Sequence, residues 1–220
     1  MNLLEAWDLY RFYHTGDDET RALRGVSLHL AAGELVALLG PSGSGKSTLL
    51  ACLAGLDEPD GGHVTLLGQR LTRRPEAERA ARRAAGLGIL LQRGNLFAQL
   101  TIAENLRLQQ QLARRVDPAR ITALLAEVGL PDRDSARPAD LSGGEAARAG
   151  LAVALAAAPP VLLADEPTGE VDGATEVALL DLLTARRQSG AGTLVATHSA
   201  ALAARADRVL HLRDGRLVDG

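Results

Sequence analysis

The sequence predicts an α/β fold with a parallel β-sheet at its centre and antiparallel strands beside it. Apolar runs of strand length alternate with helix-length amphipathic segments, and 46% of the 220 residues are hydrophobic, which is enough to bury a core. Four of the runs are largely apolar at consecutive positions, as is typical of strands buried on both faces of a parallel sheet. These expected strands are residues 34–39, 88–91, 161–164 and 193–197.

The helical patterns lie between these strands and carry start and stop signals. Asp117 followed by Pro118 is typical of an N-cap and a first helical position, and Gly129 is typical of the residue after a helix end. The Arg- and Ala-rich residues 70–85 fit either a solvated helix or a loop. The expected helices are residues 47–53, 119–128, 143–157, 174–188 and 200–206.

Other strand patterns alternate apolar with polar residues, which is typical of antiparallel strands with one exposed face. Residues 26–30 and 64–67 show this alternation. Residues 209–218 are predicted to form two short strands joined by Asp214-Gly215, a dipeptide that favours a hairpin turn. We therefore expect an antiparallel part next to the parallel sheet.

Composition and charge exclude several classes of protein. The net charge is −3, so no strong attraction to nucleic acid is expected. Cys52 is the only cysteine, which excludes an internal disulfide and a four-cysteine zinc site and favours a reducing compartment. Residues 1–10 do not resemble a secretory signal. The most apolar stretch, residues 150–164, contains Pro159 and Pro160 and is shorter than the ~20 residues of a membrane-spanning helix.

A phosphate-binding loop is predicted between an expected strand and an expected helix, because the pattern G-x-x-x-x-G-K-[ST] fits at every fixed position. Its glycines let backbone N–H groups point at one anion, and the helix N-terminus adds a positive end. Lys46, the chain's only lysine, would contact the β- and γ-phosphates, and the Ser47 hydroxyl would bind Mg²⁺. The predicted nucleotide-binding residues are Gly40, Pro41, Ser42, Gly43, Ser44, Gly45, Lys46, Ser47 and Thr48.

Two adjacent carboxylates follow the expected strand at residues 161–164. Successive side chains of a strand point to opposite sides, so Asp165 is predicted to face a metal ion and Glu166 to face an attacking water. Such a pair suits phosphoryl transfer to water, in which one carboxylate holds Mg²⁺ and the other orients or deprotonates the water.

A second anion site is predicted where residues 141–145 precede a helix. Ser142 at the N-cap, followed by Gly143 and Gly144, would leave backbone N–H groups exposed at the positive helix end. The same residues also fit an ordinary capped helix without a ligand.

Together these motifs resemble the ATP-binding subunit of ABC transporters, over essentially the whole chain. In that family a phosphate loop, a glutamine, an LSGGQ-type signature, an Asp-Glu strand, an aspartate loop and a histidine follow in this order. The resemblance implies a P-loop NTPase fold with a RecA-like parallel core, an antiparallel β subdomain and an inserted α-helical subdomain. It implies one domain, residues 1–220, with the core in 1–92 and 158–220 and the signature-bearing helical subdomain in 93–157.

The resemblance also assigns roles to single residues. Glu166 and His198 resemble the catalytic residues, Gln92 resembles the glutamine that bridges Mg²⁺ and a membrane partner, and Tyr13 resembles the aromatic residue that stacks on adenine. Tyr10 is the rival for that stacking role. The implied metal ligands are Ser47, Gln92 and Asp165. The residues expected to contact the nucleotide of the other subunit are Ser142, Gly143, Gly144, Glu145 and Asp172.

Three positions depart from the family pattern. Glu145 occupies a position at which many members have Gln, although Glu at a helix start suits the helix dipole. Ala147 and Val153 stand where polar and arginine side chains are usual, while Arg148 is retained. The loss of those polar groups is expected to alter the signature's position or to slow turnover.

Residues 55–62, 95–101, 104–105 and 168–169 resemble a branch of lipoprotein-release, macrolide-export and cell-division ATPases. The implied protein hydrolyses ATP with Mg²⁺, dimerises around two ATP and drives a separate integral-membrane permease. The expected type is an exporter or extractor, at the cytoplasmic face of the inner or plasma membrane. No nucleic-acid partner is expected. The alternatives are a mechanotransmitting ATPase that activates an extracytoplasmic enzyme and, less favoured, a soluble non-transport ABC ATPase.

Overall fold

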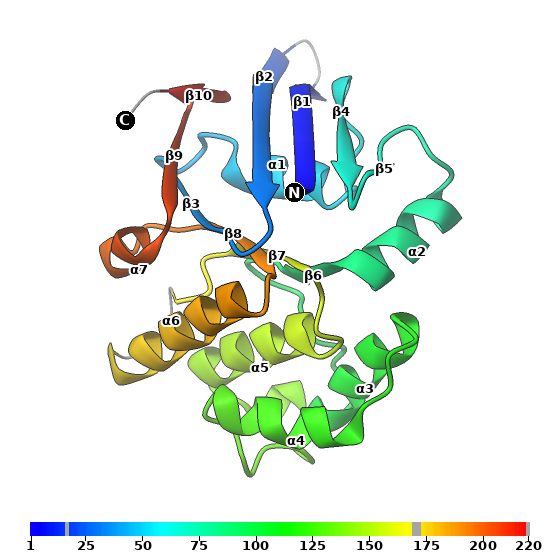
Figure 1. The fold of residues 1–220 in the computed structure, drawn as a ribbon, viewed down its shortest axis with the longest axis vertical. Coiled ribbons are helices and arrows are strands. Elements are labelled where there is room, and N and C mark those ends of the chain that lie inside the picture. Colours follow the sequence, from blue (N-terminus) through cyan, green and yellow to red (C-terminus); the bar gives the residue numbers. More distant parts are fainter. Residues whose placement is uncertain (16–17, 169–172, 219–220) are drawn as a thin grey trace.

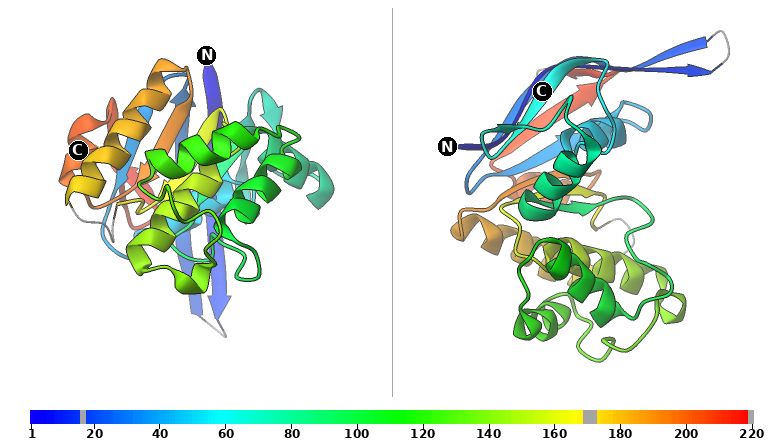
Figure 2. Two further views of the ribbon diagram at one scale, coloured as in Figure 1. Left: turned by 90° about the horizontal axis from the view of Figure 1, so that it is seen from below. Right: turned by 90° about the vertical axis from the view of Figure 1, so that its right-hand side faces the viewer.

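The computed structural model describes residues 1–15, 18–168 and 173–218. Two β-sheets form its frame (Figure 1). The helix that follows the predicted phosphate loop, α1 (Lys46–Leu53), packs between the sheets, and its apolar residues share one core with residues of both. The remaining helices lie beside the six-stranded sheet or on its side away from α1 (Figures 1 and 2).

A six-stranded sheet contains the parallel core, in the order β10-β9-β3-β8-β7-β6. All neighbours are parallel except β10, which pairs antiparallel with β9. The four predicted parallel strands and the predicted hairpin are therefore confirmed, the former within one residue at each end. The strands are β3 (Leu35–Leu39), β6 (Leu87–Leu90), β7 (Val161–Asp165), β8 (Gly192–Ala196), β9 (Arg208–Arg213) and β10 (Arg216–Val218).

The central strands are apolar throughout because both of their faces are covered. In β3, Val36 and Leu38 belong to the core around α1, whereas Leu35 and Ala37 belong to a second core on the opposite face. The second core is formed with the helices on the far side of the sheet. This two-sided burial removes the apolar–polar alternation that an exposed face would impose.

The second sheet is antiparallel, in the order β2-β1-β4-β5. Its strands are β1 (Asn2–Thr15), β2 (Asp18–Ala31), β4 (Gly61–Leu66) and β5 (Gln69–Arg70), and β1 and β2 extend beyond their neighbours (Figure 2). The alternating pattern detected only part of this sheet. Register shifts along β1, one of them around Asp8 with a positive φ of 46°, interrupt the two-residue period of its side chains.

The five predicted helices are confirmed within two residues at each end, and residues 70–85 contain a helix, α2. The sequence pattern did not single out α3, because its buried positions include two polar residues. Asn105 and Gln110 satisfy their side-chain amides with backbone groups and so interrupt the apolar spacing. The helices are α2 (Glu76–Gly86), α3 (Ile102–Leu112), α4 (Pro118–Glu127), α5 (Gly143–Leu155), α6 (Gly173–Gln188) and α7 (Ala200–Arg205), with a 3₁₀ turn at Pro138–Asp140.

Candidate functional site

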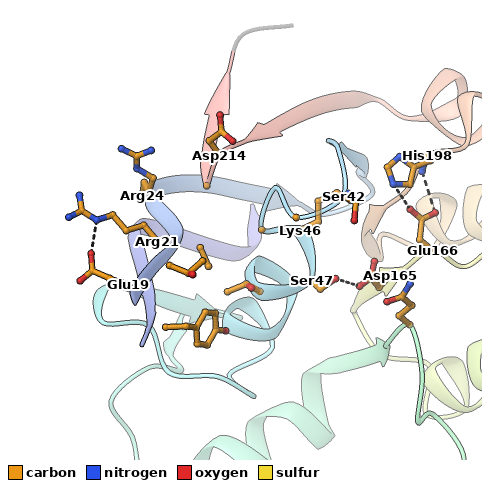
Figure 3. Close-up of a pocket in the computed structure, with 18 residues that line it drawn as sticks. Glu19, Arg21, Arg24, Ser42, Lys46, Ser47, Asp165, Glu166, His198 and Asp214 are labelled. Atoms are coloured by element: carbon orange, nitrogen blue, oxygen red, sulfur yellow. Dashed lines mark hydrogen bonds and ion pairs between the residues drawn. The ribbon is translucent and has the colours of Figure 1, made fainter. Parts of the chain in front are cut away.

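The carboxyl ends of four neighbouring strands meet at one edge of the six-stranded sheet. β3 leads into residues 40–45, β7 into Glu166, β8 into His198 and β6 into Gln92. Ligands of open α/β sheets usually bind beyond this edge. A cavity of about 740 Å³ lies here, and segments following all four strands line it together with β2 (Figure 3).

The loop from residue 40 to residue 45 requires glycine at both of its ends. A Cβ at Gly40 would lie 2.2 Å from the carbonyl oxygen of Leu212, and a Cβ at Gly45 would lie 2.4 Å from that of Ala22. Gly45 also has a positive φ of 104°, at the N-cap of α1. The loop thus keeps its backbone close to neighbouring strands, as its predicted anion-binding form needs.

Lys46, the first residue of α1, is buried beside this loop. Its Nζ donates hydrogen bonds to the carbonyl oxygens of Gly40 and Pro41, at 2.7 and 3.1 Å. An ammonium has three donor hydrogens, so one is left for a phosphate oxygen. The Ser44 hydroxyl is buried without a hydrogen-bond partner among the described residues, and the Gly215 backbone N–H donates to the Ser44 carbonyl oxygen at 3.1 Å.

The predicted metal ligands Ser47 and Asp165 lie together, with the Ser47 hydroxyl donating to Asp165 Oδ2 at 2.6 Å (Figure 3). Gln92 is exposed and lines the same cavity. Mg²⁺ is usually held by one or two protein oxygens together with substrate phosphates and waters, so this sparse set of oxygen donors fits it. The described residues contain no cluster of three His, Cys, Asp or Glu that could hold a metal by itself.

Glu166 lies beyond the end of β7, so the prediction that strand alternation orients its side chain is wrong. Its predicted role toward the attacking water stays a prediction. β7 ends at Asp165, and Glu166 has a positive φ of 51°. Its backbone N–H donates to the carbonyl oxygen of Ala196 in β8, at 2.9 Å. A left-handed conformation in a non-glycine residue is strained and is found preferentially at functional sites.

The Glu166 carboxylate faces His198 (Figure 3). The His198 backbone N–H donates to Oε2 at 3.2 Å, and His198 Nε2 lies 3.5 Å from Oε1. Oε1 is buried and accepts no hydrogen bond from the described residues. His198 Nε2 is thus the charged partner of this buried oxygen whenever the imidazole is protonated.

Of the two tyrosines considered for the stacking role, Tyr13 lies at the cavity and Tyr10 does not. Tyr13 lines the cavity, and its hydroxyl donates to Asp57 Oδ2 at 2.6 Å. The Tyr10 ring packs over two glycines instead, since a Cβ at Gly25 would lie 2.9 Å from its hydroxyl and one at Gly61 would lie 3.1 Å from its ring.

The signature segment forms the predicted N-cap. Ser142 Oγ accepts from the Glu145 N–H at 3.2 Å, and Glu145 Oε2 accepts from the Ser142 N–H at 2.9 Å. Arg133 donates to the other oxygen of Glu145 from Nε and Nη2, at 2.9 and 2.8 Å. The backbone hydrogen bond from Ser142, followed by the contact with Arg133, lowers the pKa of Glu145.

The structure does not bring the signature to the Lys46 cavity of the same chain. None of the residues 142–145 lines that cavity, whereas Ala147 lines an adjoining hollow of about 400 Å³ with Gln92 and Glu166. Asp172 lies outside the described residues. The two predicted anion sites are therefore separate within one chain.

Sequence reasoning missed one wall of the cavity. The turn between β9 and β10 contributes Asp214 and Gly215, which had been recognised only as a hairpin signal. Strand β2 contributes residues that carry no motif, and only its pairing with β1 places them there. These residues are Glu19, Thr20, Arg21, Ala22 and Arg24, of which Figure 3 labels Glu19, Arg21 and Arg24.

Known proteins resemble this chain over most of its length. Residues 23–169 match the family model described as "ABC transporter". The chain is 41% identical over 222 residues to the lipoprotein-releasing system ATP-binding protein LolD of Acinetobacter baylyi, which covers 99% of this chain and 97% of the relative. It is 41% identical over 219 residues to the macrolide export ATP-binding/permease protein MacB of Hyphomonas neptunium, covering 98% of this chain but 34% of that longer protein.

Solved structures agree with these relatives. A dimeric structure of the ABC transporter cassette MJ0796 superposes with a TM-score of 0.93 at 31% identity, covering 98% of this chain and 97% of that one. The same cassette in a post-hydrolysis state, bound to ADP and Pi, gives a TM-score of 0.94 at 30% identity and the same coverage. The predicted fold class and ATPase activity are confirmed. The chain belongs to the ABC transporter family of ATP-binding and ATP-hydrolysing cassettes.

Proposed function

We propose that two copies of this chain enclose two molecules of ATP with Mg²⁺, and that their closing and opening drive a separate integral-membrane permease. The observation that carries the proposal is the cavity at the sheet edge. It joins Lys46, Ser47, Asp165, Glu166 and His198, which come from segments far apart in the sequence. This set contains a phosphate binder, two metal-ligand candidates and a carboxylate paired with a histidine.

The separation of the two predicted anion sites supports the dimer. The signature N-cap does not reach the chain's own cavity, so Ser142, Gly143 and Gly144 of one copy would complete the site of the other. The cassette with the similar fold was solved as a dimer. ATP would then hold two incomplete sites together, and hydrolysis would release them.

Within the site, Lys46 and the loop N–H groups would hold the phosphates, while His198 would contact the γ-phosphate. Ser47, Asp165 and Gln92 would hold Mg²⁺, which supplies charge neutralisation for the phosphates. Glu166, whose side chain lines the cavity beside His198, would accept a proton from the attacking water.

A mainly apolar groove supports a helical membrane partner. α2, β6, α3 and α5 surround a hollow of about 290 Å³. Amphipathic helices bind in grooves of this character. Val153, at the position where the family usually has arginine, contributes to its apolar wall. The groove is lined by Ala80, Arg83, Ala84, Leu87, Ile89, Gln109, Leu112, Val153 and Ala154.

Within the described part of the chain, no helix combines the length and the hydropathy needed to cross a membrane. We place the protein at the cytoplasmic face of the membrane through its partner, as an exporter- or extractor-type subunit. Residues 93–157 would form the helical subdomain, and the core would comprise 1–92 and 158–220.

Mechanical activation of an extracytoplasmic enzyme through the same partner is the second candidate function, because an identical ATP cycle would serve it.

A pull-down from native membranes tests this function. Tagged Glu166→Gln with ATP·Mg²⁺ is expected to co-purify an integral-membrane protein with a large extracytoplasmic domain, identified by mass spectrometry. Ala84→Glu, which places a charge in the groove, should lose this partner in the Glu166→Gln background. In the parent background, where Glu166 is intact, Ala84→Glu should retain ATP turnover. Ala126→Glu, on the exposed face of α4, is the matched control. Recovery of soluble proteins or nucleic acid alone would contradict the proposal.

A further inference from the structure

A cluster of charged and aromatic side chains lies beside the cavity, and the sequence motifs gave no role to its arginine, Arg11. Arg11 binds Asp57 through two hydrogen bonds of 2.9 Å, one from Nε to Oδ2 and one from Nη2 to Oδ1. Arg11 Nη1 also lies 3.2 Å from Asp60 Oδ2. Such a forked pairing fixes the plane of the guanidinium group. We refer to Arg11, Tyr13, Asp57 and Asp60 as the Tyr13 cluster.

The same carboxylate fixes Tyr13. Asp57 Oδ2 accepts both the hydrogen bond from Arg11 Nε and the 2.6 Å hydrogen bond from the Tyr13 hydroxyl. The Arg11 guanidinium carbon lies 4.6 Å from the centroid of the Tyr13 ring, within the range of a cation–π contact. The ring is therefore held at its hydroxyl end and covered by a cation.

Only one side of the ring is covered in this way. Tyr13 lines the cavity, but Arg11 is not among the described residues that do. Tyr13 is 38% exposed, whereas the Arg11 side chain is 21% exposed. Arg11 thus lies on the side of the ring away from the cavity, and the accessible part of the ring faces the ligand space.

We propose that Arg11, fixed by Asp57, is a positioning residue for the nucleotide base: it holds the Tyr13 ring as a flat surface on which the purine stacks. The inference rests on the ATP site proposed above. The bound arrangement would be a stack of guanidinium, phenol ring and purine. A ring that is already ordered loses less conformational entropy when a ligand binds to it.

The cluster also links the base to the phosphate loop. Asp57 and Asp60 lie in the segment after α1, the helix that begins at Lys46, while Arg11 and Tyr13 lie in β1. Asp60 Oδ2 additionally accepts the backbone N–H of Phe12 at 2.7 Å. These two carboxylates therefore connect the strand that carries Tyr13 to the segment that follows the phosphate-binding helix.

Calorimetry with ADP and with pyrophosphate, each with Mg²⁺, tests whether Arg11 positions the Tyr13 ring for the base or only stabilises the fold. Neither measurement requires turnover or an ATP-dependent dimer. Arg11→Ala is expected to weaken ADP binding about tenfold, within the range of base stacking on an aromatic side chain. The affinity for pyrophosphate, which has no base, should change less than about twofold in the same variant. Arg11→Lys, which keeps a cation but loses the fork, should lie between Arg11→Ala and the parent. Arg120→Ala, which breaks an ion pair with Glu127 on α4, is the matched control.

A double-mutant cycle gives a second readout. If Arg11 acts through the ring, Arg11→Ala should cost little once Tyr13→Ala is present, so the two losses should not add. In steady-state assays Arg11→Ala should raise KM for ATP and leave kcat within about twofold. Three results would each overturn the inference. The losses of ADP affinity in Arg11→Ala and Tyr13→Ala could add, Arg11→Ala could weaken ADP and pyrophosphate binding equally, or Arg11→Ala could leave ADP binding unchanged.

Failure of the inference differs from failure of the proposed ATP site. If Lys46→Ala removes ADP binding while Arg11→Ala has no effect, only the role of Arg11 is wrong. If ADP binding survives Lys46→Ala, the site itself is wrong. Should Arg11→Ala fail to fold, as its thermal unfolding would show, Arg11→Lys still decides the question through the same ADP and pyrophosphate comparison.

Discussion

Lys46 combines the features of a phosphate-binding residue. It is the chain's only lysine, it is buried at the start of α1, and its ammonium donates to two carbonyls of the loop after β3. Lys46→Ala is therefore expected to weaken ATP binding at least about 100-fold, since it removes a charge-assisted contact and leaves loop carbonyls unpaired. Isothermal titration calorimetry measures this loss. Arg120→Ala should bind ATP like the parent, and an unchanged affinity in Lys46→Ala would refute the phosphate-loop assignment.

For single residues, the sequence predicts contacts within short motifs and misses contacts between residues that are far apart in the chain. The phosphate loop and the Asp-Glu pair are local patterns. The orientation of Glu166 depends on a left-handed backbone beyond the end of β7, which strand periodicity does not indicate. The partner of Tyr13, Asp57, lies 44 residues away and comes into contact only through the fold.

Among the elements, α5 depends on its N-terminal contacts. Arg133 pairs with Glu145, which occupies the position where many family members have an uncharged Gln. In the proposed dimer, Arg133→Ala would leave the negative charge of this carboxylate without its arginine counter-ion near the partner's phosphates. ATP-dependent dimerisation should weaken about threefold, in keeping with an exposed ion pair, and added salt should reduce the effect.

The double variant Arg133→Ala/Glu145→Gln is the control for this prediction, because it removes the unpaired charge. It should dimerise like the parent in a Glu166→Gln background, measured by analytical ultracentrifugation. If the double variant is as weak as Arg133→Ala, the charge of Glu145 is not the cause and Arg133 acts in another way.

For the whole molecule, the link between β1 and the segment after α1 makes stability depend on pH. Burial alone would raise the pKa of Asp57, but the hydrogen bonds from Arg11 and Tyr13 outweigh it and lower that pKa below its ordinary 3.8. The contribution is therefore present above about pH 4 and is lost as the pH falls through the lowered pKa. In urea unfolding, Asp57→Asn should be less stable than the parent at pH 7 by roughly 1 kcal/mol. The two free energies of unfolding should converge below pH 4; a constant difference would contradict this.

The fold class was predictable because buried parallel strands leave long apolar runs that few other structures produce. Two elements, β1 and α3, were not predictable from the sequence pattern. β1 contains register shifts that interrupt its alternation, and α3 buries polar side chains that bond to backbone. The same limit applies to the cavity, whose β2 wall exists only because strands distant from the phosphate loop pair beside it.

The central claim is that two chains share two nucleotide sites, and the molecular mass of Glu166→Gln tests it most directly. Analytical ultracentrifugation with and without ATP·Mg²⁺ should show a monomer without nucleotide and a dimer with it. Ser142→Arg, which blocks the signature N-cap, should bind ATP but remain monomeric. A Glu166→Gln chain that binds ATP and stays monomeric, or a Ser142→Arg chain that dimerises normally, would contradict the shared site.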